Sequence, residues 1–483
     1  MLMRLPLPNR VRANTPMTSS ARRALVLTIV SCVLLLSTTP AAQVATAPAS
    51  PSDATVVQRV DEYMQAERKV NGFCGTILLA RKGTPIVAKG YGLANAEWEI
   101  PNTPRTKFRL GSITKQFTSM AVLQLQQQSK LKVQDPICQY LTPCPDAWKP
   151  ITIHHLLTHT SGIPSYTNAP SYMTTMMVPK TVDQMVAGFR DLPLEFEPGS
   201  QYKYNNSGYF LLGVLLERVT GQTYERVLRD QIFTPLGMSD SGYDYPARIL
   251  PMRASGYSRQ GSSLTNAPYL DMVQPFSAGS LYSTVEDLLK WDQALYTDQL
   301  LPSEGRSAMF TPFKGNYAYG WQVPTPSPQT FGRRQVAHGG GINGFSTMII
   351  RLPDDNIASI VLSNVQQAST GRIARDLLAI LFGQPYQVAV ARTVATVDPK
   401  IYDAYVGQYE LTPTFILTVT REGDRLMTQA TGQPKLEVFP ESETKFFLKA
   451  VDAQLTFVKD ESGTVTHVIL HQGGKDQKAQ KTK

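Results

Sequence analysis

The sequence predicts an α+β protein in which strands from both ends of a long main domain form one sheet against helices. Strand patterns occur early, in residues 75–92, and late, in "FSTMIIRLP" and "NIASIVLSN". Helical periodicity dominates the residues between them. Because early and late strands flank a helical block, a sheet packed on helices is the economical arrangement. A run of short strand patterns after residue 400 indicates a second, smaller β domain.

The individual elements follow from local patterns along the chain. Residues 53–70 have apolar residues at helical spacing, and "GTILLARKGTPIVAKGYG" reads as two strands around a turn. Further helices are expected over residues 112–131, 208–228, 283–295 and 372–382. The 483-residue chain is too long for one small core. We therefore expect the following parts: a signal peptide at 1–47, the main domain at 52–385, a linker at 386–399, the small β domain at 400–472, and a basic tail at 473–483.

The N-terminus has the pattern of a secretory signal. Five arginines without an acidic residue precede an apolar run at 24–36, and small residues follow. Cleavage is expected near Ala42 or Ala47, which predicts an exported protein, periplasmic or secreted. An uncleaved membrane anchor is the alternative, although the apolar run is short for a bilayer span. A lipoprotein is less favoured, because the apolar run continues past Cys32.

The charge balance argues against a nucleic-acid partner. The net charge is +9, and removal of residues 1–47 takes away five arginines and leaves +4. The terminal stretch "KDQKAQKTK" carries +3 of that remainder. The body of the protein is therefore nearly neutral and has no basic stripe. No stable membrane span is expected after signal cleavage, and the oligomeric state is left open.

Three cysteines remain after the predicted cleavage. Cys138 and Cys144 are close together in "ICQYLTPCP", and export implies an oxidising compartment. We therefore expect a local disulfide between them. Cys74 would then be an unpaired thiol, buried rather than reactive.

The stretch "FRLGSITKQF" places Ser112 and Lys115 three residues apart, after a glycine and at the start of an apolar helix. Residues i and i+3 share a helix face, so the amine can reach the hydroxyl. Burial lowers the pKa of a lysine and allows it to accept a proton. The Ser112 N–H at the helix start can help to hold an oxyanion. A helix-start serine beside a solvated lysine is an equally good interpretation of this motif alone.

Two further segments favour the catalytic interpretation. "YKYNNSGYFLLG" contains Tyr204 and Asn206 ahead of a helix, and "VAHGGGINGFST" contains His338 and three glycines before a strand. With Ser-x-x-Lys, these segments resemble the serine β-lactamase and penicillin-binding-protein family, especially its class C β-lactamase and D-alanyl-D-alanine carboxypeptidase branch. The resemblance spans about residues 55–385. It implies an α/β sandwich, an antiparallel sheet flanked by helices, together with an all-helical subdomain. The last strands resemble the small β-barrel-like domain of some family members.

The resemblance also implies a role for each motif residue. Ser112 would be the acylated nucleophile, and Lys115 and Tyr204 would share the proton transfers. Asn206 would bind the substrate amide or order Lys115. His338 would face the scissile bond from a strand edge. The N–H of Gly341 would be the second oxyanion donor, and Gly339 and Gly340 would let the substrate backbone approach.

Each of these residues also has a purely structural interpretation. Tyr204 can be a core tyrosine, Asn206 a helix cap, and His338 a strand histidine beside a glycine turn. His154, His155 and His159 in "HHLLTH" lack the glutamate of an HExxH metal motif, so no metal and no cofactor are expected.

We expect an exported serine hydrolase that forms an acyl-enzyme on an amide or ester. A D-amino-acid peptide or peptidoglycan fragment is the favoured substrate, as for a D-alanyl-D-alanine carboxypeptidase. An esterase or a true β-lactamase of the same fold is the alternative, as is a receptor that binds such ligands without turnover. At the position of His338, members of this family often have a lysine. A histidine at this position is mostly uncharged at neutral pH. Tight recognition of a free carboxylate, as in β-lactams, is therefore in doubt.

Overall fold

The computed structural model describes residues 51–482 except 261–262, 450, 452 and 473–474. The predicted signal peptide at 1–47 lies outside these residues. Within the part that the model describes, no helix is both long and apolar enough to cross a membrane.

The main domain is built on one five-stranded antiparallel sheet in the order β10-β11-β12-β1-β2. Its strands are β1 (Gly75–Arg81), β2 (Thr84–Tyr91), β10 (Val336–Ile342), β11 (Phe345–Leu352) and β12 (Ile357–Ser363). The early and late strands meet where β1 pairs with β12, with Ile77 opposite Val361. The predicted sheet of early and late strands is confirmed.

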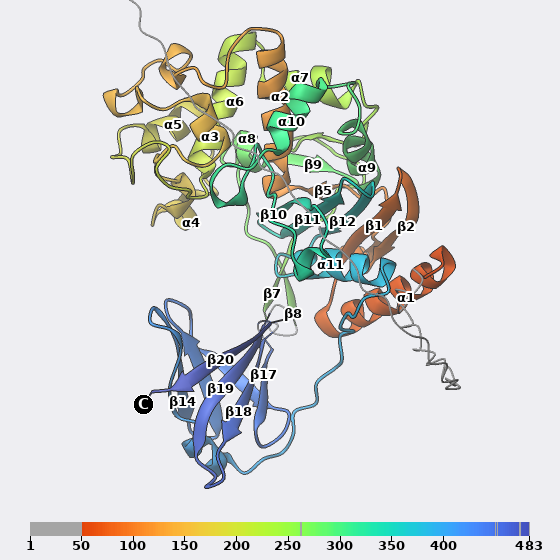
Figure 1. The fold of residues 1–483 in the computed structure, drawn as a ribbon, viewed down its shortest axis with the longest axis vertical. Coiled ribbons are helices and arrows are strands. Elements are labelled where there is room, and N and C mark those ends of the chain that lie inside the picture. Colours follow the sequence, from red (N-terminus) through yellow and green to blue (C-terminus); the bar gives the residue numbers. More distant parts are fainter. Residues whose placement is uncertain (1–50, 261–262, 450, 452, 473–474, 483) are drawn as a thin grey trace, which may run out of the picture. The chain divides into compact units, whose positions relative to one another are not determined.

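Helices cover both faces of this sheet. α1 (Asp53–Ala66) and α11 (Thr370–Leu381) lie together on one face (Figure 1). Val60 and Leu377 pack there against Ile77 and its neighbours. Leu78 points to the other face, as strand alternation requires, and packs with the helices of the rest of the domain.

The remaining helices form a helical region around α2 (Thr114–Gln127), nearly all of whose side chains are buried. Short strands in the same domain form one three-stranded sheet and two strand pairs. The helices are α3 (Ile153–Leu157), α4 (Tyr172–Thr175), α5 (Val182–Arg190), α6 (Asn206–Thr220), α7 (Tyr224–Leu228), α8 (Phe276–Gly279), α9 (Val285–Ala294) and α10 (Ser303–Phe310). The short strands are β3 (Leu93–Asn95), β4 (Ile100–Pro101), β5 (Phe108–Arg109), β6 (Gly242–Tyr243), β7 (Tyr257–Gln260), β8 (Ser263–Asn266) and β9 (Leu281–Ser283).

The C-terminal domain is a closed eight-stranded antiparallel barrel, β13 to β20 in sequence order. Inward-facing residues such as Tyr409, Val419 and Phe457 form its own core. Its strands are β13 (Gly407–Thr412), β14 (Phe415–Glu422), β15 (Arg425–Ala430), β16 (Leu436–Pro440), β17 (Lys445–Leu448), β18 (Ala453–Lys459), β19 (Val465–Gln472) and β20 (Lys475–Lys481). The expected barrel-like domain is confirmed.

One boundary of this domain differs from the prediction. Residues 475–481, expected in a basic tail, form β20, which pairs with β19 and β13 and closes the barrel. The strand pattern is weak because Ala479 is the only apolar residue in the strand, and it is fully buried. Backbone pairing therefore holds a segment whose composition resembles a tail.

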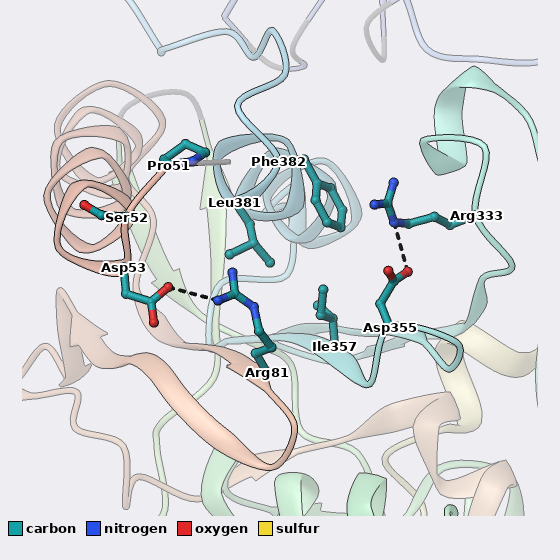
Figure 2. A pocket seen from close by; sticks show the side chains of 9 residues that line it. All are labelled: Pro51, Ser52, Asp53, Arg81, Arg333, Asp355, Ile357, Leu381 and Phe382. Atoms are coloured by element: carbon teal, nitrogen blue, oxygen red, sulfur yellow. Dashed lines mark hydrogen bonds and ion pairs between the residues drawn. The ribbon is translucent and has the colours of Figure 1, made fainter. Parts of the chain in front are cut away.

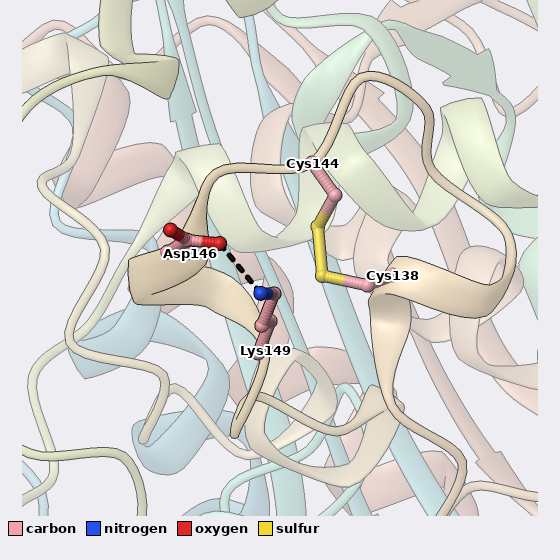
Figure 3. The surroundings of a disulfide bond; sticks show 4 residues. All are labelled: Cys138, Cys144, Asp146 and Lys149. Carbon is pink, nitrogen blue, oxygen red and sulfur yellow. Dashed lines mark ion pairs between the residues drawn. A yellow bond between two sulfur atoms is a disulfide. The ribbon is translucent and has the colours of Figure 1, made fainter.

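A disulfide joins Cys138 to Cys144, the pair expected from the sequence, with 5.5 Å between their Cα atoms (Figure 3). The bridge closes a short loop between α2 and α3. Cys74 is a free, half-buried thiol. The effect of mutating the disulfide cysteines can therefore be compared with the effect of mutating the free cysteine.

We predict that the variant Cys138→Ser/Cys144→Ser loses about 2 kcal/mol of unfolding free energy, because a short cross-linked loop restricts the unfolded chain modestly. All four tryptophans lie in the main domain, so tryptophan fluorescence in urea reports its unfolding. Cys74→Ser is the control and should retain its sensitivity to reductant. A double variant that reductant still destabilises would contradict the assignment.

Candidate active site

Ser112 lies in a turn that the strand β5 and the helix α2 hold in place. The turn, Gly111–Ile113, is a 3₁₀ turn that runs directly into α2. Gly111 has a φ of 54°, in the left-handed region. A Cβ atom on Gly111 would lie 2.9 Å from the backbone nitrogen of Gly341. Glycine therefore lets the nucleophile turn lie directly against β10.

Lys115 is fully buried, and its amine lies at the centre of the site. Its Nζ is 3.0 Å from Ser112 Oγ and 2.9 Å from Asn206 Oδ1. The carbonyl oxygen of Ala278 is 2.8 Å from the same nitrogen. Burial lowers the pKa of this ammonium well below its ordinary value. In its neutral form the amine can donate its two N–H groups to Asn206 and Ala278 and turn its lone pair to the Ser112 hydroxyl.

Two adjacent asparagines have different roles: one caps a helix and the other contacts Lys115. Asn205 is the N-cap of α6, and its Oδ1 accepts from the Gly208 N–H at 2.7 Å. Asn206 is therefore not the cap. Its Oδ1 is left for Lys115, and its Nδ2 donates to Thr167 Oγ1 at 3.1 Å. The structure places Asn206 as an ordering partner of the lysine amine.

Tyr204 packs beside the same amine, with Lys115 Nζ 4.9 Å from its ring centroid. Burial raises the pKa of the Tyr204 phenol well above its ordinary value, and an interaction with the Ser112 side chain opposes this shift only in part. No described residue makes a regular hydrogen bond with this hydroxyl. Tyr204 is therefore a protonated phenol beside the Ser112 side chain.

His338 lies on β10 and is buried rather than open to solvent. Its Nδ1 donates to the Gly339 carbonyl at 2.6 Å, which fixes the proton on Nδ1. Its Nε2 then accepts from the Tyr317 hydroxyl at 2.9 Å. Burial, followed by the charge that Lys115 would carry, lowers the pKa of His338 to about 3. The ring is therefore neutral at physiological pH.

The glycines after His338 differ in the space around them. A Cβ on Gly340 would lie 1.9 Å from the Leu110 carbonyl, and one on Gly339 would touch Met348. Gly341 is exposed, and a Cβ there would meet nothing within 4 Å. Gly340 thus permits the close approach of β10 to the nucleophile turn. Gly341 leaves its backbone next to Gly111, near the N–H of Ser112.

Several groups in the site could not be expected from sequence patterns. The Ala278 carbonyl is a backbone group, so its residue type carries no signal. Thr167 and Ser165 lie in a polar loop, "PSYTN", and Ser165 Oγ accepts from the Asn206 N–H at 3.1 Å. Tyr317 reaches the site from a segment without any motif. Only the loop had a usable signal, its cluster of hydroxyl side chains.

The three histidines of "HHLLTH" have separate hydrogen-bond partners. His154 Nδ1 bonds the Tyr319 hydroxyl, and His155 Nδ1 accepts from the Thr152 N–H. His159 Nδ1 accepts from the Asn205 N–H. No group of three metal-binding side chains occurs among the residues that the model describes. The histidines thus stabilise the turn beneath Tyr204 and α6.

One cavity lies away from this site. It has a volume of about 500 Å³ and lies where β1 ends and β12 begins, the opposite ends of the strands from Gly341 (Figure 2). Its charges neutralise each other, because Arg81 pairs with Asp53 and Arg333 pairs with Asp355. It offers neither a nucleophile nor an unpaired charge.

Ser112, Lys115, Tyr204 and Asn206 are called the catalytic cluster here. A second cavity of about 270 Å³, called the α5 pocket, is lined by part of the loop 164–169, which hydrogen-bonds to Asn206 of this cluster. Its walls come from the loop 164–169, from α4 and α5, and from Gln274. Lys180, just before α5, lines it too.

Comparisons with known proteins agree with this architecture. A family model described as Beta-lactamase matches residues 56–384, and one described as a domain of unknown function matches residues 391–481. Penicillin-binding protein 4* of Bacillus subtilis (strain 168) is 32% identical over 445 residues, 85% of this chain and 95% of that protein. A putative penicillin-binding protein of the same organism, PbpX, is 31% identical over 67% of this chain and 78% of its own length.

Solved structures show the same fold. The octameric penicillin-binding protein homologue from Pyrococcus abyssi superposes with a TM-score of 0.62 at 26% identity, over 88% of this chain and 100% of that one. A penicillin-binding protein from Bacillus halodurans gives a TM-score of 0.57 at 27% identity, over 68% and 98%. With a family model that matches more than half of its length, this chain belongs to the β-lactamase and penicillin-binding-protein family of serine hydrolases.

Proposed function

We propose that this protein is an exported hydrolase that acylates Ser112 with a D-amino-acid peptide, a peptidoglycan fragment or a related amide or ester. The observation that carries the proposal is the buried Lys115 amine, 3.0 Å from Ser112 Oγ. A serine hydroxyl is a weak nucleophile until a nearby base takes its proton. A neutral amine with both N–H groups engaged elsewhere is such a base.

Acylation then proceeds in three balanced movements. Ser112 Oγ attacks the substrate carbonyl as its proton passes to Lys115 Nζ. The carbonyl oxygen becomes an oxyanion, held by the N–H groups of Ser112 and Gly341. The carbon–nitrogen or carbon–oxygen bond breaks, and the leaving group takes a proton from the Tyr204 phenol, which Lys115 restores. Water repeats these steps to free the acid from Ser112.

The high pKa of Tyr204 supports this division of roles. A phenolate is costly where burial raises the pKa of the phenol, whereas the same burial makes a neutral lysine accessible. Lys115 is thus the proposed acceptor, and Tyr204 the donor.

His338 bears on the choice of substrate. Its ring is neutral and both of its nitrogens are engaged, so it gives no fixed positive charge to a substrate carboxylate. Tight binding of a β-lactam carboxylate is therefore not supported by this residue, which favours amides and esters without a carboxylate beside the scissile bond. A true β-lactamase, and a receptor that binds without turnover, are the competing proposals.

The direct test is labelling of Ser112. We predict that a fluorophosphonate or penicillin probe adds to Ser112 in the wild type, as shown by peptide mass spectrometry, and that Ser112→Ala abolishes labelling and turnover. Among p-nitrophenyl esters, D-alanyl peptides and nitrocefin, ester or peptide turnover should exceed nitrocefin turnover. Turnover that survives in Ser112→Ala would exclude the nucleophile. Labelling without turnover of any substrate would favour the receptor.

Lys115 makes the activity dependent on pH. Only the neutral amine accepts a proton, so kcat/KM should rise with pH through a Lys115 pKa that lies well below 10.5. Lys115→Arg, always protonated, should lower kcat/KM by about 10³-fold, the scale of general-base catalysis. Lys115→Gln should lose the acidic limb of the pH profile together with most of the rate. An unchanged limb in Lys115→Gln would assign it to another group.

The neutral state of His338 has a thermodynamic signature. In the unfolded chain histidine titrates near 6.5, while His338 in the folded protein titrates near 3. Between these values the unfolded state binds more protons, so stability falls as pH falls below 6.5. We predict that the loss of unfolding free energy between pH 7 and pH 4 is smaller in His338→Gln by about 3 kcal/mol. Urea titrations at both pH values measure this difference, and equal losses would contradict it.

A further inference from the structure

We propose that the α5 pocket binds the acyl part of the substrate and selects an apolar chain that ends in a carboxylate. This inference rests on the proposed function, because it assumes that Ser112 is acylated. The pocket combines a shared wall with the catalytic cluster, an apolar floor and an unpaired cation.

The wall that the pocket shares with the catalytic cluster is the loop 164–169. Ser165 Oγ accepts from the Asn206 N–H, and the Tyr166 N–H donates to Ser207 Oγ at 2.9 Å. The residues Ser165, Tyr166 and Asn168 line the pocket. Between them, Thr167 accepts from Asn206 Nδ2. This loop therefore lies between Asn206 and the pocket, so the two share it as a wall.

The floor of the pocket is aromatic and apolar. Tyr166 stacks on Phe189 at 6.3 Å between ring centroids, and Phe189 and Met185 are buried. The cavity volume of about 270 Å³ is on the scale of one long side chain. This floor suits an aliphatic or aromatic chain and gives no partner to a charged group.

The rim of the pocket is held in place by buried hydrogen bonds. Gln274 Nε2 donates to the carbonyls of Thr175 and Val178, at 2.8 and 3.0 Å, which fixes α4 and the turn after it. Gln274 is almost completely buried. The pocket is therefore formed before a substrate arrives, which favours selectivity over adaptation.

The two charged side chains that line the α5 pocket differ in whether they have an ion-pair partner. Glu195 lines it, but its carboxylate pairs with Lys203 at 2.6 Å. Lys180 is half-buried, and none of the described residues forms an ion pair or hydrogen bond with its ammonium. The pocket therefore presents one uncompensated positive charge at the edge of an apolar floor. A carboxylate at the end of an apolar chain complements both features.

Two esters with the same six-carbon acyl chain test this proposal. Mono-p-nitrophenyl adipate carries a terminal carboxylate, and p-nitrophenyl hexanoate does not. We expect kcat/KM for the adipate ester to exceed that for the hexanoate by about tenfold, and the ratio to shrink in high salt. p-Nitrophenyl acetate is too short to fill the pocket and reports the catalytic cluster alone.

Three variants separate charge from shape. Lys180→Gln should reduce the adipate-to-hexanoate ratio to about one. Gly188→Leu fills the pocket from α5, because Gly188 lines it and a Cβ there meets nothing within 4 Å. This variant should lower kcat/KM for both six-carbon esters relative to kcat/KM for p-nitrophenyl acetate. Lys130→Gln removes an exposed lysine at the far end of α2 and should leave all three rates unchanged.

The outcomes distinguish the two proposals. Acetate turnover with an adipate-to-hexanoate ratio of one in the wild type would overturn the pocket assignment and leave the acyl-enzyme intact. The same conclusion would follow if Lys180→Gln and Lys130→Gln had equal effects. Absence of all turnover would refute the proposed function. Calorimetry of adipic acid monoamide with Ser112→Ala would then still test the pocket, because binding that Lys180→Gln does not weaken would overturn it.

Discussion

The burial of one amine organises the catalytic part of this protein. Lys115 lies at the start of α2, whose other side chains fill the centre of the helical region, so the amine cannot reach water. Burial makes a charged ammonium there costly, and the nitrogen hydrogen-bonds with two carbonyl oxygens and one hydroxyl. Each neighbour of the amine comes from a different part of the chain: the nucleophile turn, the start of α6 and the carbonyl of Ala278. The fold must be complete before the base exists.

Much of this arrangement could be predicted from the sequence, and the reasons are local. A glycine before Ser112 and an apolar-periodic helix after it mark a helix start with the lysine one turn away. The strands on either side of the helical block could be expected to pair with each other. The hydrophobic runs of β1 and β12 indicate strands that are buried on both faces, as in the middle of a covered sheet. The motifs with Tyr204, Asn206 and His338 then indicate the β-lactamase and penicillin-binding-protein family.

Other features could not be predicted, because they depend on the backbone or on register. The Ala278 carbonyl has no residue-type signal. Which of Asn205 and Asn206 caps α6 is decided by one residue of register, since either could bond a helix N–H. β20 looks like a basic tail because a strand that closes a barrel needs backbone pairing more than apolar side chains. The α5 pocket joins residues from separate loops and helices, whose proximity no spacing rule predicts.

The pairing of β1 with β12 determines the order in which this domain can assemble. β1 can pair at once with β2, which follows it directly, but all of the helical region lies between β1 and β12 along the chain. The second edge of β1 therefore has no partner in a nascent polypeptide until almost the entire domain is synthesised. During that interval one edge of the apolar strand β1 stays open to chaperones and to aggregation.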